Sequence, residues 1–151
     1  MEILIENQQE SQVISLERLQ QIALKILDAL ECPDETELSV LIVNDVAIQE
    51  INRDYLQRDH PTNVISFSQQ EGEKLGGPVT LLGDVVISAE TAARDAAEAG
   101  IEMFDELVFL LLHGILHLLG YDHERGTQAE AERMEVREQQ VHALLKAERL
   151  I

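Results

Sequence analysis

Two β-rich segments stand close together along the chain, at residues 62–68 (TNVISFS) and 81–88 (LLGDVVIS). The glycine-rich loop between them, Gly72 to Pro78, is too short for the helical crossover that joins parallel strands. The two segments are therefore predicted to be antiparallel neighbours. Because helices and further strands surround this pair, the pattern favours an α+β domain with a mixed sheet.

Hydrophobic spacing and capping residues predict the remaining elements. Further strands are expected at 2–7 and 38–43, and helices at about 16–30, 45–55, 89–99, 102–120 and 128–145. In the second helix, Val46, Ile48 and Ile51 are expected to face inward. Residues 1–151 are thus predicted to form a single α+β domain, with a small mixed sheet of about four strands packed with about five helices.

The composition limits the cellular location and the binding partners that can be expected. Cys32 is the only cysteine, so no disulfide can form within the chain. Cys32 is expected to be an unreactive residue that serves only in packing. The amino terminus shows no signal peptide, and the longest apolar stretch is shorter than a membrane span, so a cytoplasmic location is expected. Eleven basic against 29 acidic residues give a net charge of −18, which opposes non-specific nucleic-acid binding. Neither DNA nor a membrane is expected as a partner.

Three of the five histidines lie within residues 113–123 (HGILHLLGYDH). His113 and His117 are four residues apart, which places both rings on one face of a helix. Gly120 can take the left-handed conformation that ends the helix and reverses the chain, so that His123 can point back toward the same place. Three imidazoles without a fourth protein ligand are typical of a catalytic zinc, which keeps one position open for water.

Other interpretations stay open for some of these residues. Each histidine could instead be a core residue bonded to a backbone carbonyl, although packing gives no reason for a third at this offset. The spacing matches the metzincin proteases, but Gly114 stands where their helix carries the glutamate base. Gly114 fits close approach to the metal and tight helix packing equally well. His60 and His142 are expected to be solvated.

The segment HGILHLLGYDH resembles the signature of the YbeY endoribonucleases, the bacterial rRNA maturation factors. Residues 51–67 (INRDYLQRDHPTNVISF) and 83–88 (GDVVIS) resemble the second and third motifs of that family. The resemblance implies an α+β fold and a zinc-dependent, single-strand-specific endoribonuclease. It implies a role in 3′-end maturation of 16S rRNA and in ribosome quality control, with one Zn²⁺ bound by His113, His117 and His123.

The chain departs from the family pattern in its second motif. Leu56 stands where the family usually has a functional arginine, and Arg58 follows two residues later. Arg58 can either bind the same phosphate, which suits a guanidinium, or pair with Asp59 as a surface charge. Likewise, Asp122 can either orient a ligand ring or face solvent. Asp84 is expected to be an edge-strand charge rather than a wall of the site.

Single-stranded RNA of the 16S rRNA precursor is the expected substrate. Because basic residues are few, the small ribosomal subunit or an assembly factor is expected to deliver it. Two other functions stay open. One is a metalloprotease-like peptidase with another base, which the glycine at 114 disfavours. The other is a non-catalytic assembly factor with a structural zinc, which the open coordination position disfavours.

Overall fold

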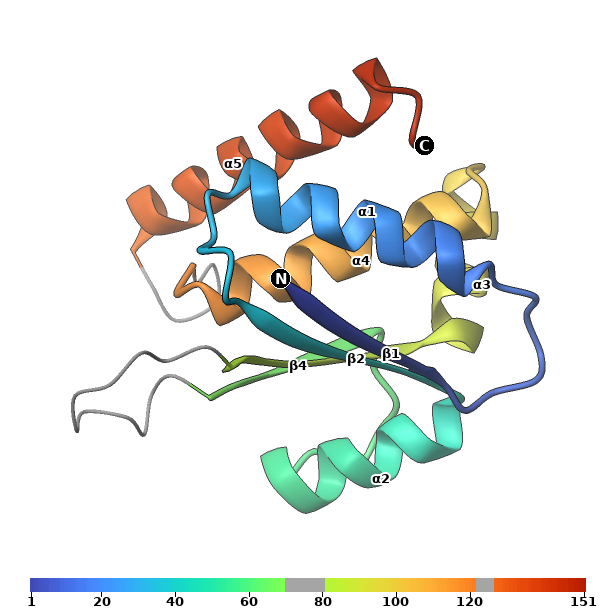
Figure 1. Cartoon of the computed structure of the whole chain (residues 1–151). Coiled ribbons are helices and arrows are strands. Elements are labelled where there is room, and N and C mark those ends of the chain that lie inside the picture. Colours follow the sequence, from blue (N-terminus) through green and yellow to red (C-terminus); the bar gives the residue numbers. More distant parts are fainter. Residues whose placement is uncertain (70–80, 122–126) are drawn as a thin grey trace.

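A four-stranded mixed sheet forms the centre of the computed structural model, which describes residues 1–69, 81–121 and 127–151 (Figure 1). The strands are β1 (Glu2–Asn7), β2 (Glu37–Val43), β3 (Val64–Ser68) and β4 (Leu81–Ser88), in the spatial order β1-β2-β4-β3. β2 is parallel to both β1 and β4, whereas β3 is antiparallel to β4. The predicted α+β class, the mixed sheet and the antiparallel pair are confirmed. The glycine-rich loop predicted at 72–78 lies outside the described residues.

The described residues form five helices close to the predicted ranges. They are α1 (Leu16–Ala29), α2 (Asp45–Leu56), α3 (Ala89–Ala99), α4 (Met103–Leu118) and α5 (Gln128–Ala147). Side-chain oxygens of Ser15, Asn44, Ser88 and Thr127 accept a bond from the first turn of their helices, as N-caps do. Gly120 has φ +98°, so the positive φ predicted for the glycine that ends α4 is confirmed; the reversal toward His123 lies outside the described residues.

The helices cover the sheet unequally, and Figure 1 shows α2 alone on one face. On the other face α4 lies against β3 and β4, α1 lies beside it, and α5 packs over α1 and α4. α4 is buried on nearly all sides, with Leu107, Leu111 and Ile115 fully inaccessible. Its apolar sequence is explained by this central position between the sheet and the outer helix.

Two expectations about side-chain positions are wrong. Val46 of α2 is 66% exposed, and Asn52 of the same helix is buried instead. Asp84 does not lie on an edge strand, because β4 is internal to the sheet between β2 and β3. Its carboxylate is half-exposed and accepts a hydrogen bond from Gln69 Nε2 at 3.3 Å.

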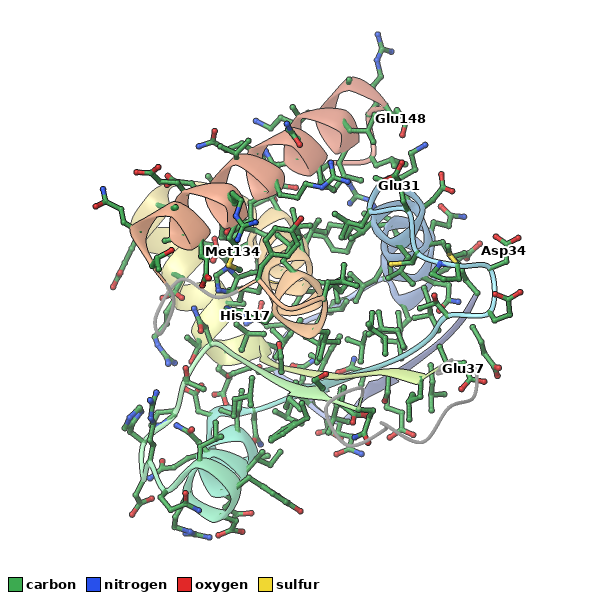
Figure 2. All side chains as sticks on the ribbon, turned by 90° about the vertical axis from the view of Figure 1, so that its left-hand side faces the viewer. Glu31, Asp34, Glu37, His117, Met134 and Glu148 are labelled. Carbon is green, nitrogen blue, oxygen red and sulfur yellow. The ribbon has the colours of Figure 1, made fainter. Side chains whose placement is uncertain are left out.

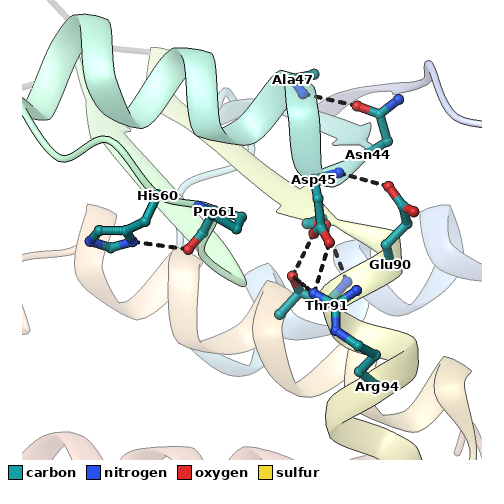
Figure 3. A network of polar contacts seen from close by, with 9 residues as sticks. Asn44, Asp45, Ala47, His60, Pro61, Glu90, Thr91 and Arg94 are labelled. Atoms are coloured by element: carbon teal, nitrogen blue, oxygen red, sulfur yellow. Dashed lines mark hydrogen bonds and ion pairs between the residues drawn. The ribbon is translucent and has the colours of Figure 1, made fainter.

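A polar network fixes the start of α2 against the start of α3 (Figure 3). The Asp45 carboxylate accepts hydrogen bonds of 2.6 Å from the hydroxyls of Ser88 and Thr91, and pairs with Arg94 at 2.7 Å. Burial alone would raise the pKa of Asp45, but these three donors and the charge of Arg94 hold it below its ordinary value. Glu90 closes the network by accepting from the Asp45 N–H at 2.8 Å.

Candidate active site

A cleft of about 930 Å³ opens where α4, β3 and the loop after α2 meet. Its walls include His113 and His117 from α4, Ser66 from β3, and Asn63 and Arg58 from the loop. A cleft in which a few polar side chains converge is a usual setting of an enzyme active site. The structure thus brings Arg58 and two of the three predicted ligand histidines to one cavity.

His113 and His117 lie one helical turn apart and turn their Nε2 atoms toward each other. The two Nε2 atoms are 3.1 Å apart and the ring centroids 4.7 Å apart. Two imidazoles bound to one tetrahedral zinc at about 2.0–2.1 Å have nitrogens about 3.3 Å apart. The donor pair therefore fits such an ion. Figure 2 labels His117 on α4.

The third predicted ligand, His123, and its neighbour Asp122 lie outside the described residues. Within residues 1–69, 81–121 and 127–151, no group of three histidine, cysteine or carboxylate side chains could hold a metal ion. The ligand set of His113, His117 and His123 therefore stays a prediction, and so does the role of Asp122.

Gly114 places the two histidines by letting α4 approach the sheet closely. A Cβ atom at this position would lie 2.7 Å from Cγ1 of Val85 on β4 and 3.2 Å from Oγ of Ser66 on β3. The Ser66 hydroxyl also donates to the Gly114 carbonyl at 3.0 Å. Of the two roles left open for Gly114, the contacts show tight packing against the sheet.

Glu138 of α5 is a site residue that the sequence did not indicate. Its Oε2 lies 3.4 Å from Nδ1 of His113, and the two side chains are 12% and 19% exposed. Because α5 carries many charged residues, charge alone did not single out this carboxylate. Its spacing from the apolar residues Met134 and Val141, four before and three after, could have revealed it, because such spacing defines one helical face.

The loop that carries Arg58 is held by the buried side chain of Asn52. Asn52 Nδ2 donates to the His60 carbonyl at 2.9 Å, and the Arg58 N–H donates to the Asn52 carbonyl at 3.2 Å. No ion pair joins Arg58 to Asp59 among the described residues. Asp59 instead accepts a hydrogen bond from Gln49 at 3.0 Å. Arg58 and Leu56 both line the cleft, and both are exposed.

The remaining singled-out side chains lie as follows. His60 is exposed, as predicted, and its Nδ1 lies 3.0 Å from the Pro61 carbonyl oxygen (Figure 3). His142 is not fully solvated: it is half-buried and meets the Phe109 ring edge-on, with centroids 6.5 Å apart. Cys32 is half-buried, and burial raises the pKa of its thiol, in agreement with inert packing. No helix in the described parts of the chain is both long and apolar enough to cross a membrane.

The fold and the site together define a small α+β enzyme whose cleft is lined by paired imidazoles. Comparison with known proteins makes this class specific. The profile of the family described as Endoribonuclease YbeY matches residues 4–146. The chain belongs to this family, and like its relatives it is a nuclease that hydrolyses RNA.

Named relatives cover nearly the whole chain. It is 62% identical over 144 residues to an Endoribonuclease YbeY of Syntrophotalea carbinolica, covering 95% of each chain. It is 51% identical over 151 residues to that of Geobacter metallireducens, covering 100% of both. A solution structure of a Thermotoga maritima protein has a TM-score of 0.60 at 21% identity, covering 98% of this chain and 94% of the other. That likeness shows the shared fold.

Proposed function

We propose that this endoribonuclease is zinc-dependent and cuts single-stranded RNA in 3′-end maturation of 16S rRNA and in ribosome quality control. The observation that carries the proposal is the pair of Nε2 atoms, 3.1 Å apart in the wall of a polar cleft. In this proposal His113, His117 and His123 hold one Zn²⁺, and residues 1–151 act as one catalytic domain. The resemblance to the YbeY signature supports the third ligand.

In this proposal, the residues of the cleft have different roles in RNA cleavage. Three protein ligands leave one coordination position for the substrate side, where the bound metal would supply Lewis-acid stabilisation and activate water. Arg58, an exposed residue that lines the same cleft, can bind a phosphate of the RNA backbone with two parallel N–H donors. Gly114 offers no glutamate base, but phosphodiester cleavage depends more on charge stabilisation than on such a base. Asp122 remains a candidate for orienting the ring of His123.

The net charge of −18 makes delivery of the substrate part of the proposal. Few phosphates can be neutralised by 11 basic side chains spread along the chain, so free RNA should bind weakly. The small ribosomal subunit, or an assembly factor bound to it, would bring the rRNA precursor to the cleft. Because that substrate is made and processed with the ribosome, we place the enzyme in the cytoplasm.

Metal content of purified variants tests the ligand assignment. The wild type should hold close to one zinc per chain, and His113→Ala, His117→Ala and His123→Ala should each lose most of it. His60→Ala is the matched control, because His60 lines the same cleft but is exposed and outside the ligand set. Equal zinc in all five proteins would show that the histidines of 113–123 are not the ligands.

A further inference from the structure

The His113 ring is held from three directions by neighbours on two helices. The Phe109 ring stacks near it, with centroids 6.3 Å apart and an interplanar angle of 29°. The His117 ring lies edge-on to the His113 ring, and the Nε2 atoms of the two rings are 3.1 Å apart. Glu138 approaches its other nitrogen, Nδ1, from α5. Both ring nitrogens therefore face a defined partner, on opposite sides of the ring.

We propose that Glu138 is a positioning residue that fixes the tautomer and orientation of His113 for metal binding. The inference rests on the proposed function, because it takes His113 as a metal ligand. A neutral imidazole carries its proton on one nitrogen and its lone pair on the other. A carboxylate next to Nδ1 favours the proton there, which leaves the lone pair on Nε2, the atom that faces His117.

The burial of Glu138 and its distance from His113 are consistent with a specific interaction between the two side chains. The Glu138 side chain is only 12% exposed, and a carboxylate with so little access to water is costly unless it is paired. The Nδ1–Oε2 distance of 3.4 Å is longer than an ordinary N–H···O bond. A shift of a few tenths of an ångström would bring it into that range.

The packing of α5 keeps Glu138 in this position. Met134 and Val141, on the same face of the helix, are buried in the core. Between them, Arg137 donates from Nη2 to the carbonyl of Ala29 at the end of α1, at 3.0 Å. The helix is thus attached on both sides of Glu138, and the carboxylate is held over α4. α5 would then be part of the metal site rather than only a cover over the core.

Zinc affinity, measured by competition with a chromophoric chelator, tests the inference on the full-length protein. Glu138→Ala should weaken zinc binding by about 10- to 100-fold, the usual effect of losing a partner behind a ligand histidine. Glu138→Gln keeps an oxygen acceptor and the side-chain shape, so it should lose less than the alanine variant. Glu135→Ala is the matched control, because Glu135 is an exposed carboxylate one turn earlier on α5, lining the same α4–α5 groove.

Imidazole ¹⁵N NMR of the metal-free proteins provides a readout that a merely structural role would not move. His113 should carry its proton on Nδ1 in the wild type and in Glu138→Gln, and shift toward the other tautomer in Glu138→Ala. An unchanged tautomer would overturn the inference even if affinity falls. Zinc affinity of Glu138→Ala within threefold of wild type would overturn it too, and His117→Ala separates the two proposals. If His117→Ala loses zinc in that case, only the role of Glu138 fails; if it retains zinc, the ligand assignment fails as well.

Discussion

The close packing of Gly114 against the sheet predicts how α4 responds to a single added methyl group. In Gly114→Ala the new Cβ would lie 2.7 Å from Cγ1 of Val85, far inside normal contact distance. Val85 is fully buried on an internal strand and β-branched, so its side chain cannot easily rotate away. The helix must therefore move from the sheet, which also strains the Ser66–Gly114 hydrogen bond of 3.0 Å.

Two opposing effects set the size of the change. Replacing glycine by alanine inside a helix stabilises by about 1 kcal/mol. Overpacking a well-packed core costs about 1–3 kcal/mol. The net effect should be a loss of roughly 0–2 kcal/mol in the free energy of unfolding. The stability change of Gly114→Ala alone does not show whether the clash with Val85 causes it. The methyl groups of Val85 must therefore be removed in a second variant.

A double-mutant cycle measured by urea unfolding isolates the contact. Val85→Ala alone should destabilise by about 1–3 kcal/mol, because it leaves a cavity. In that background Gly114→Ala should stabilise by about 1 kcal/mol, since the cavity now accepts its methyl group. The two changes should thus couple favourably by about 1–3 kcal/mol. A coupling energy below about 0.5 kcal/mol would refute the packing role of Gly114.

Three further predictions concern the cleft, the polar network and the charge. Arg58→Ala should slow RNA cleavage about ten- to a thousandfold at equal zinc content and stability, because one phosphate donor is lost. If Arg58 is instead only a surface charge, this variant should cleave RNA as fast as the wild type, and Leu56→Arg should raise activity. Asp45→Asn should lower the free energy of unfolding at pH 7 by about 1–2 kcal/mol, since Ser88 and Thr91 lose a charged acceptor. Because folding lowers the pKa of Asp45, the stabilisation by its ionised carboxylate is fully present above the unfolded pKa of about 4 and is lost as the pH falls below it. The difference in free energy of unfolding between wild type and Asp45→Asn should therefore shrink at low pH, and a constant difference would contradict this. RNA affinity should depend only weakly on salt in a titration, and a slope that implies six or more phosphate contacts would contradict the estimate from net charge.

Local chemistry explains why most of the fold could be predicted. Ser15, Ser88 and Thr127 cap their helices in the structure because a side-chain acceptor before an apolar-periodic run satisfies free N–H groups. The antiparallel pairing of β3 and β4 follows from a connection too short for a crossover. The position of β4 inside the sheet was missed, since the order of strands depends on long-range packing that no local pattern records.

The site was predictable where its residues share one element. His113 and His117 lie on one helix, so their spacing alone brings them together. Glu138 and Asn52 were not found, because each acts through a partner on another element or in a loop. Val46 and Asn52 show the limit most directly: the apolar side chain of α2 is exposed, and the amide is buried to hold the loop.

Metal content and RNA cleavage, followed together on one sample through chelation and reconstitution, test the central claim most directly. The account predicts that cleavage of a single-stranded RNA disappears as zinc is removed and returns in proportion as about one zinc per chain is restored. The His117→Ala variant, treated in the same way, should regain neither metal nor activity. Cleavage that persists in the metal-free protein, or that fails to return with bound zinc, would contradict the account.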